Sequence, residues 1–287
     1  MGGVGEHVEA VGGHDAEILQ AHAELARQVD ARLHGDDVAG HERPLVARSE
    51  HRLLVDVDAH AVAEAVAAKC LPSVVYVETY ADAGGQLQGL GTGSGVVMTE
   101  DGYLITNNHV VDGGSAYKVT IAGNTYDAEL VGTDPSSDVA VLKAKDASGL
   151  TPMEIGDSDN LTVGEWVMTL GAPFGLEQSV ATGIVSATSR SQIMDAQESM
   201  QSGGTGEITI YPNMIQTDAA INPGNSGGAL VDDEGKLIGI NTLITSYSGN
   251  YSGVGFAIPV NYAINLAQQI IAGETPTHAQ LGVSLST

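Results

Sequence analysis

The sequence contains little cysteine, few basic residues and no long apolar run, and each shortage excludes a class of protein. The single cysteine, Cys70, rules out an intramolecular disulfide framework and a cysteine-rich zinc site. Lys and Arg total 11 against 36 Asp and Glu, and a net charge of −25 is unsuited to nucleic acid, whose phosphates bind clustered basic side chains. No stretch approaches the roughly 18 apolar residues of a membrane-spanning helix. No signal peptide is visible, because the N-terminus lacks a basic flank and an apolar stretch.

The composition changes near residue 60 and so divides the 287 residues into two parts. Seven of the nine histidines lie within residues 1–61, and this part contains no Lys, Asn, Thr, Phe, Tyr or Trp. Its apolar spacing over Asp15–Leu33 predicts an amphipathic helix. The narrow residue usage equally fits a start codon misplaced in a GC-rich gene. Residues 1–61 are therefore an uncertain segment, either helical or disordered, or not natural protein at all.

From Ser73 onward, short β-rich runs alternate with turn residues. About a dozen such runs predict an all-β antiparallel barrel or sandwich, with two possible halves of six strands, 74–144 and 165–258. Helical patterns over Ala59–Cys70 and Val260–Ala272 flank these strands. The predicted strands are Val74–Thr79, Ser94–Met98, Tyr103–Thr106, Tyr117–Ala122, Thr125–Thr133, Val139–Ala144, Glu165–Leu170, Val180–Thr188, Met214–Thr217, Gly228–Val231, Lys236–Asn241 and Val254–Ile258.

Two segments carry a titratable residue at the edge of a predicted strand. His109 follows the strand Tyr103–Thr106 and is the only histidine between residues 61 and 277. A lone histidine is structural more often than catalytic. Asp138 opens an apolar strand that would hold its carboxylate near the core, where a carboxylate needs a partner. It could equally cap the preceding turn, so neither residue by itself predicts a function.

A third segment places a serine among glycines. Ser226 lies between Asn225 and Gly227, and glycines at this spacing allow a sharply bent backbone with an exposed hydroxyl. The same bend would aim the N–H groups of Gly224 and Ser226 at one point, as in an oxyanion hole. Taken alone this is a weak signal, because glycine-rich turns that contain serine are common.

The three segments together form a much stronger pattern. A serine hydroxyl becomes a nucleophile when a base removes its proton, and that base needs a carboxylate to fix its tautomer. The chain supplies His109, Asp138 and Ser226 in that order, each at the edge of a β segment. We therefore predict a catalytic triad with base and acid in the first half and nucleophile in the second. Such a triad implies no cofactor and no metal.

The segments around these residues resemble the HtrA (Deg) serine proteases. The resemblance runs from about Val62 to the C-terminus and implies an all-β, chymotrypsin-like double six-stranded antiparallel β-barrel with a helix at each end. It implies that His109 is the general base, that Asp138 orients it and that Ser226 is the nucleophile. The oxyanion hole would be formed by Gly224, Asn225 and Ser226. The matching segments are Thr106–Val111, Ser137–Lys143, Gln216–Gly228, Gly91–Gly95 and Gly255–Pro259.

The resemblance also predicts the domain organisation. Residues 62–275 correspond to the protease domain, and residues 276–287 to a linker and the first strand, Gln280–Leu285, of a PDZ domain that the chain has no room to complete. Family members carry a signal peptide or membrane anchor, so we expect a membrane-anchored whole protein in a bacterial envelope or periplasm. A homotrimer is expected to pack through Leu71–Tyr80, although the valines of that segment could simply form a core strand.

In trypsin-like enzymes that prefer basic side chains, an acid lies six residues before the serine. Here that position is Ala220, so the pocket is not built to pair Lys or Arg. We predict cleavage after small apolar residues in unfolded or misfolded proteins, which fits protein quality control. The predicted pocket residues are Ala220, Ile221, Leu243 and Ile244. Gln86–Gly93 is predicted to be a mobile loop, and Ser189–Thr209 either a regulatory loop or a plain disordered insertion.

Two other functions compete with this prediction. The glycine–serine segment fits the nucleophile elbow of an α/β-hydrolase, but that fold needs an acid and then a histidine after the serine. Only His278 follows Ser226. The other competitor is a non-cleaving, chaperone-like binder of unfolded segments on the same fold. Cys70 is expected to face the core or an adjoining subunit, with a reactive thiol as the alternative.

Overall fold

Two closed barrels contain all twelve strands that the described residues form. The computed structural model describes residues 60–172, 178–194, 209–244 and 253–278. The chain divides into two units, Met1–Val62 and Ala63–Thr287, and the strands belong to the second. The predicted helix over Asp15–Leu33 and the predicted strand Gln280–Leu285 lie outside the described residues.

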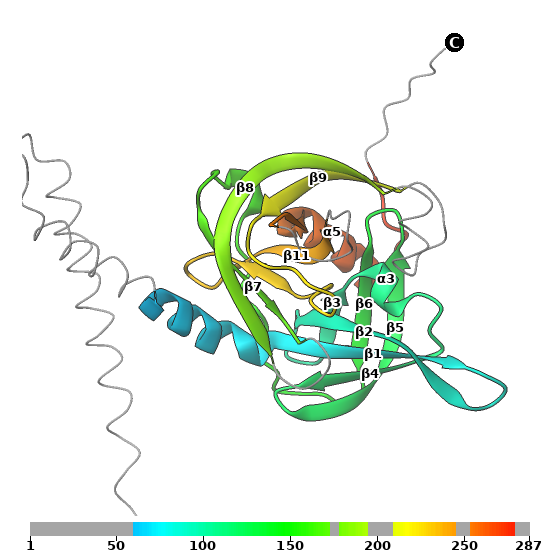
Figure 1. Ribbon diagram of the computed structural model, residues 1–287. Coiled ribbons are helices and arrows are strands. Elements are labelled where there is room, and N and C mark those ends of the chain that lie inside the picture. The colour runs from blue at the N-terminus through cyan, green and yellow to red at the C-terminus, as the bar shows by residue number, and fades with distance from the viewer. Residues whose placement is uncertain (1–59, 173–177, 195–208, 245–252, 279–287) are drawn as a thin grey trace, which may run out of the picture. The chain divides into compact units, whose positions relative to one another are not determined.

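The first barrel closes in the order β1-β2-β3-β6-β5-β4 (Figure 1). Strand β4 alternates buried and more exposed side chains, with Tyr117, Val119 and Ile121 buried, whereas β6 is buried over most of its length. A two-residue turn joins β4 to β5, and positive φ angles at Ala122 and Gly123 suit a tight hairpin. The strands are β1 (Val74–Asp82), β2 (Leu87–Val97), β3 (Tyr103–Thr106), β4 (Ala116–Ile121), β5 (Asn124–Asp134) and β6 (Val139–Ala144).

The second barrel closes in the order β10-β11-β12-β9-β8-β7. Counted from β7, each strand has the same neighbours as its counterpart in the first barrel, so one topology occurs twice. The predicted double six-stranded antiparallel barrel is confirmed. The strands are β7 (Trp166–Gly171), β8 (Ser179–Met194), β9 (Thr209–Thr217), β10 (Ala229–Val231), β11 (Leu237–Ile244) and β12 (Gly255–Pro259).

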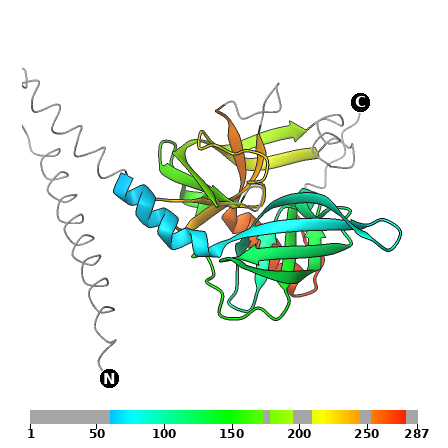
Figure 2. The same cartoon turned by 60° about the horizontal axis from the view of Figure 1, so that its bottom comes forward.

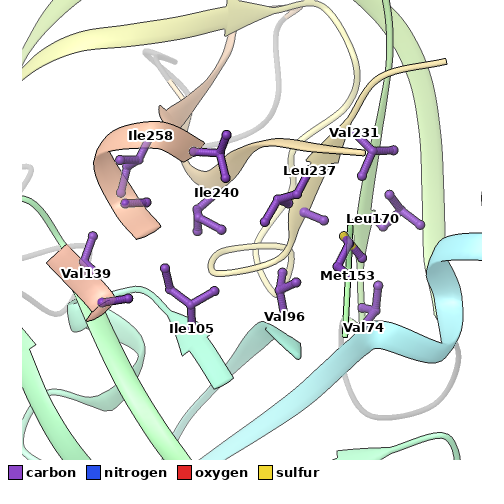
Figure 3. Packing of buried hydrophobic residues seen from close by; sticks show 14 of the residues in the cluster. Val74, Val96, Ile105, Val139, Met153, Leu170, Val231, Leu237, Ile240 and Ile258 are labelled. Carbon is purple, nitrogen blue, oxygen red and sulfur yellow. The ribbon is translucent and has the colours of Figure 1, made fainter. Parts of the chain in front are cut away.

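The largest hydrophobic cluster joins the two barrels. Figure 3 shows residues of β2, β3 and β6 facing residues of β7, β10, β11 and β12 across this core. Helix α5 (Val260–Ile271) contributes one apolar face to it and contacts strands of both barrels. A helix over residues 60–70 packs Val66 and Cys70 against the same cluster. The shorter helices are η1 (Leu71–Ser73), α3 (Asn108–Val111) and η2 (Ser158–Asn160).

Two predicted loops are partly strand. β2 begins at Leu87, and its glycines pair with β1 (Tyr80 with Gly89, Thr79 with Gly91), so the prediction of a loop over Gln86–Gly93 is wrong. Glycine has a low strand propensity, but the hairpin supplies the backbone partners that offset it. The hairpin projects away from the barrel (Figure 2). β8 likewise continues to Met194, and the remainder of the second predicted loop, 195–208, lies outside the described residues.

Residues expected at a subunit contact or in the core are buried within the chain. Val74, Val75 and Val77 are buried, so these valines belong to a core strand, and the trimer stays a prediction. Cys70 is buried, and its thiol donates to the carbonyl oxygen of Gly235 at 3.3 Å. Burial raises the pKa of this thiol to about 11, which disfavours the reactive thiolate. None of the described helices is long and apolar enough to cross a membrane.

Candidate active site

His109 and Asp138 meet where two neighbouring strands of the first barrel end. β3 pairs with β6 so that Thr106 lies opposite Ala140. α3 follows β3 directly and carries His109, and Asp138 comes just before β6. The Nδ1 atom of His109 lies 2.8 Å from Oδ2 and 3.0 Å from Oδ1 of Asp138. The backbone N–H of His109 also donates to Oδ1 at 2.9 Å, so the carboxylate holds both the ring and its backbone.

Asp138 is held from several directions. Its side chain is 3% exposed, and its φ angle of 55° lies in a region that non-glycine residues seldom adopt. Its carbonyl oxygen accepts from the side-chain amide of Asn107 at 3.0 Å and from the backbone N–H of Asn108 at 3.2 Å. The hydroxyl of Thr242, on β11 of the second barrel, donates to Oδ2 at 2.6 Å. These bonds satisfy a buried carboxylate that would otherwise be costly.

The surroundings of His109 suit a general base. Burial lowers the pKa of His109, but the charge of Asp138 and the hydrogen bond to it raise the pKa, and the net change is upward. With Nδ1 donating to the carboxylate, the neutral ring presents Nε2 as its acceptor. The side chain is 24% exposed, so an incoming group can reach it.

Ser226 lies on a tight turn that only glycines permit. Gly224 and Gly227 have φ angles of 98° and 83°. A side chain at Gly227 would collide with the carbonyl oxygen of Ser94 and the hydroxyl of Thr106. The first barrel therefore fits closely against the serine loop, and the N–H of Ser94 donates to the carbonyl oxygen of Ser226 at 2.8 Å.

The backbone N–H groups of the serine loop differ in their partners. The N–H of Asn225 donates to the carbonyl oxygen of Asn222 at 2.9 Å, and that of Gly227 donates to Asn241 at 2.8 Å. Within the described part of the chain, the N–H groups of Gly224 and Ser226 donate to no protein group. Two donors beside the serine are thus available for an oxyanion, as the proposed oxyanion hole requires.

Sequence reasoning missed the residues that brace this loop. The hydroxyl of Ser94 donates to the carbonyl oxygen of Gly224 at 2.6 Å and accepts from the N–H of Ala172 at 2.8 Å. The hydroxyl of Thr106 donates to the carbonyl oxygen of Ser94 at 2.6 Å. The sequence identifies the segment Gly91–Gly95 only as a motif, because nothing in it shows which backbone group Ser94 contacts.

Ser226 has Thr242 as its hydrogen-bond partner. Its Oγ donates to the carbonyl oxygen of Thr242 at 3.2 Å. Between described residues, no hydrogen bond links this Oγ to the ring of His109. The structure therefore brings His109 and Asp138 into direct contact and connects Ser226 to Asp138 through Thr242. Catalytic hydrogen bonds are often loose without substrate, so the arrangement is compatible with a triad that tightens on binding.

The predicted pocket is only partly visible. Ala220 is half-buried, and its carbonyl oxygen accepts from the hydroxyl of Thr169 at 2.9 Å. Ile221 is 2% exposed and packs against Gly255. For Leu243 and Ile244 only the backbone, in β11, is described, so this pocket stays a prediction. No group of three or more His, Cys, Asp or Glu residues in the described ranges could hold a metal ion.

A model of the trypsin-like peptidase domain matches residues 93–240, which include His109, Asp138 and Ser226. The chain belongs to the trypsin-like peptidase family. Within that family it is similar to the HtrA (Deg) proteases. It is 44% identical over 203 residues to the periplasmic serine endoprotease DegP of Escherichia coli K12, and equally to DegP of Salmonella typhimurium LT2. The match covers 70% of this chain but 40% of either relative.

Solved structures of this trypsin-like peptidase group agree with the fold. The HtrA-type protease AlgW with a tripeptide matches with a TM-score of 0.62 and 43% identity, over 73% of this chain and 64% of that one. AlgW with a decapeptide matches with a TM-score of 0.64 and 38% identity, over 77% and 71%. The prediction of an HtrA-like member of the family is confirmed.

Proposed function

We propose that this trypsin-like peptidase is a serine endopeptidase whose nucleophile is Ser226. The observation that carries the proposal is the buried Asp138 carboxylate bonded to Nδ1 of His109, beside a serine loop with two free N–H donors. With Nδ1 donating to the carboxylate, this pair suits the roles of a general base and its orienting acid.

The proposed reaction uses these groups in turn. His109 Nε2 takes the proton of Ser226 as its Oγ attacks the carbonyl carbon of the peptide bond. The carbonyl oxygen becomes an oxyanion that accepts from the N–H groups of Gly224 and Ser226. His109 passes its proton to the leaving nitrogen, the C–N bond breaks, and an acyl-enzyme remains. Water, deprotonated by His109, then releases the acid and restores Ser226.

The substrates we propose are unfolded or misfolded proteins, cleaved after small apolar residues. Ala220 provides no carboxylate for a basic side chain. Solved relatives contain a tripeptide and a decapeptide in their complexes, which supports a peptide ligand. An apolar pocket discriminates weakly, by about 1–3 kcal/mol per methylene, and loose specificity suits a quality-control protease.

The setting is proposed from the relatives. DegP of Escherichia coli is a periplasmic serine endoprotease, so we propose an extracytoplasmic bacterial location. The chain spans 40% of that relative, and we propose that the whole protein is membrane-anchored, trimeric and continued by a PDZ domain. The domain limits of 62–275 and 276–287 belong to the same proposal.

One observation favours a second candidate, a chaperone-like binder that does not cleave. The hydroxyl of Ser226 bonds to Thr242 and not to His109, so its proton is not yet shared with the base. A chain fixed in this arrangement would bind unfolded segments without hydrolysing them.

Digestion of β-casein by wild type and by Ser226→Ala separates the two candidates. We expect wild type to digest β-casein and to be labelled covalently at Ser226 by a fluorophosphonate. Ser226→Ala should do neither, because both reactions need the Oγ. If wild type resists the fluorophosphonate and leaves β-casein intact while it suppresses aggregation of an unfolded protein, the endopeptidase proposal fails.

A further inference from the structure

Beyond α5, a short segment of the chain returns to the first barrel. Residues 274–278, here called the C-terminal strap, follow the end of α5. The N–H of Thr277 donates to the side-chain oxygen of Gln269 at 2.9 Å, and its hydroxyl does so at 3.2 Å. This attachment to α5 delivers His278 to the turn Asp134–Asp138.

His278 makes polar contacts with three residues there. Its Nε2 lies 3.3 Å from Oδ1 and 3.2 Å from Oδ2 of Asp134, and 3.2 Å from the hydroxyl of Ser136. Its Nδ1 lies 2.9 Å from the hydroxyl of Tyr262, on α5. The same Tyr262 hydroxyl lies 2.6 Å from the hydroxyl of Ser137. The imidazole therefore reaches both ends of the turn, directly at Asp134 and through Tyr262 at Ser137.

One set of proton positions is consistent with the hydrogen bonds present. His278 donates from Nε2 to Oδ1 of Asp134 and accepts at Nδ1 from Tyr262, whose oxygen accepts from Ser137. In the described part of the chain, Oδ2 of Asp134 has no hydrogen-bond partner. The carboxylate of Asp134 is 8% exposed, and a buried carboxylate needs a partner. Among the described residues, the imidazole of His278 is the only basic side chain within ion-pair distance of this carboxylate. The contact joins a buried carboxylate to an imidazole that is 32% exposed.

The turn that these contacts hold is closed by the pairing of Asp134 with Val139, and within it the Ser136 hydroxyl donates to Oδ1 of Asp134 at 2.8 Å. Its backbone bonds are long, 3.3 Å from the N–H of Ser137 to Asp134 and 3.4 Å from the N–H of Asp138 to Pro135. It ends at Asp138 in a left-handed conformation. A small rotation of the turn would move the carboxylate away from the ring of His109, because Ser137 and Asp138 are adjacent in the chain.

We propose that His278 and Tyr262 are positioning residues for the peptidase reaction, which hold the turn so that Asp138 meets Nδ1 of His109. Neither touches the reacting atoms. The inference rests on the proposed function, since it assigns His109 as the base. It also gives the C-terminal strap a direct route to the catalytic acid, so any event that pulls His278 from the turn lowers the rate without blocking the substrate.

The test uses the full chain and compares His278→Ala and Tyr262→Phe with Tyr80→Phe. Tyr80 donates to Glu78 on the β1–β2 hairpin, so this control also removes one tyrosine hydroxyl. For each, kcat and KM on β-casein and the rate of fluorophosphonate labelling are measured. We expect kcat and labelling to fall about tenfold in both test variants, with KM changed less than about twofold, because a displaced catalytic group affects the chemical step.

A spectroscopic readout reports the position of Asp138 without any turnover. The Nδ1 proton between His109 and Asp138 should give a low-field proton resonance, which we expect to shift or broaden in His278→Ala and Tyr262→Phe and to stay unchanged in Tyr80→Phe. The double variant should be little slower than either single one, since both act through one turn. Thermal unfolding of each variant gives the folded fraction to which rates are normalised.

The outcomes distinguish failure of the positioning role from failure of the proposed peptidase function. An unchanged resonance in both variants, or normalised kcat values equal to that of Tyr80→Phe, would overturn the positioning role. A loss confined to KM would do the same. If wild type itself fails to react with the fluorophosphonate, the proposed function falls, and the resonance still decides whether His278 positions Asp138.

Discussion

The two barrels have the same strand order but contribute to the site in different ways. The first barrel supplies His109 and Asp138 from the ends of two paired strands, so ordinary β-sheet register brings them together. The second barrel supplies Ser226 from the loop between β9 and β10, whose path is determined by glycines and by backbone hydrogen bonds, two of them to Ser94 of β2 and Asn241 of β11. Side-chain electrostatics therefore positions the catalytic groups of the first barrel, and backbone conformation positions the serine of the second. Different substitutions should break each half.

Asp138→Asn should lower activity the most, because it removes the negative charge on which the His109 side of the site depends. The amide cannot hold the required tautomer of His109 or balance its charge, and activity should fall by about 10⁴-fold. The fold should survive, since the side chain keeps its shape. Initial rates on β-casein, with circular dichroism on the same samples, check this; activity within tenfold of wild type would contradict the assigned role.

Gly227→Ala should act on the conformational half. Its side chain would meet Ser94 and Thr106, and its φ angle is positive, so we expect the loop to shift. Loss of oxyanion donors should lower kcat by about 10²–10³-fold. The free energy of unfolding should fall by roughly 2–4 kcal/mol. Denaturant unfolding and kcat measure the two effects.

Gly164→Ala is the matched control for that substitution. Gly164 also has a positive φ angle, 97°, but open space surrounds its Cα. Alanine at this position should lower the free energy of unfolding by about 1 kcal/mol, from backbone strain alone, and leave kcat unchanged. Equal losses of activity in both variants would mean that contact with the first barrel does not matter.

Thr242→Val should have an intermediate effect, because Thr242 touches both halves. The substitution removes the donor to Asp138 but keeps the carbonyl group that accepts from Ser226. One lost bond to a charged group should lower kcat by about ten- to hundredfold. Thr120→Val, which removes a hydroxyl bonded to Thr125 in an exposed position, should leave kcat unaltered.

The smallest effect concerns pH. Because the pKa of His109 lies above its ordinary 6.5, the acid limb of kcat/KM should have its midpoint above that value. His109 also contributes stability at pH below its unfolded pKa, and that contribution disappears as pH rises through the folded pKa. NMR titration of the ring should show the pKa lowered in Asp138→Asn, where the burial effect remains and the charge is gone. A pKa that does not fall would contradict the electrostatic origin of the shift.

Much of this fold and part of the site were predictable from the sequence. Apolar runs bounded by turn residues predicted all twelve strands, because each strand buries side chains on one face, as in β4, or on both, as in β12. The positions of His109 and Asp138 were predictable for the same reason, since both residues flank strands. Thr242 and Ser94 were not, because their partners belong to the other barrel, and packing between barrels leaves no local pattern. The glycines of β2 led to the wrong prediction of a loop, because pairing with β1 outweighs their low strand propensity. The domain limits and the pocket residues stay predictions.

The buried cysteine can report how often the region around the core that joins the two barrels opens. Cys70 is the single thiol of the chain, and it lies against Gly235 beside the core that joins the barrels. A thiol reagent can reach it only while this region is open, so the labelling rate counts opening events without an introduced probe. The same measurement in the presence of a peptide would reveal whether substrate holds the barrels together.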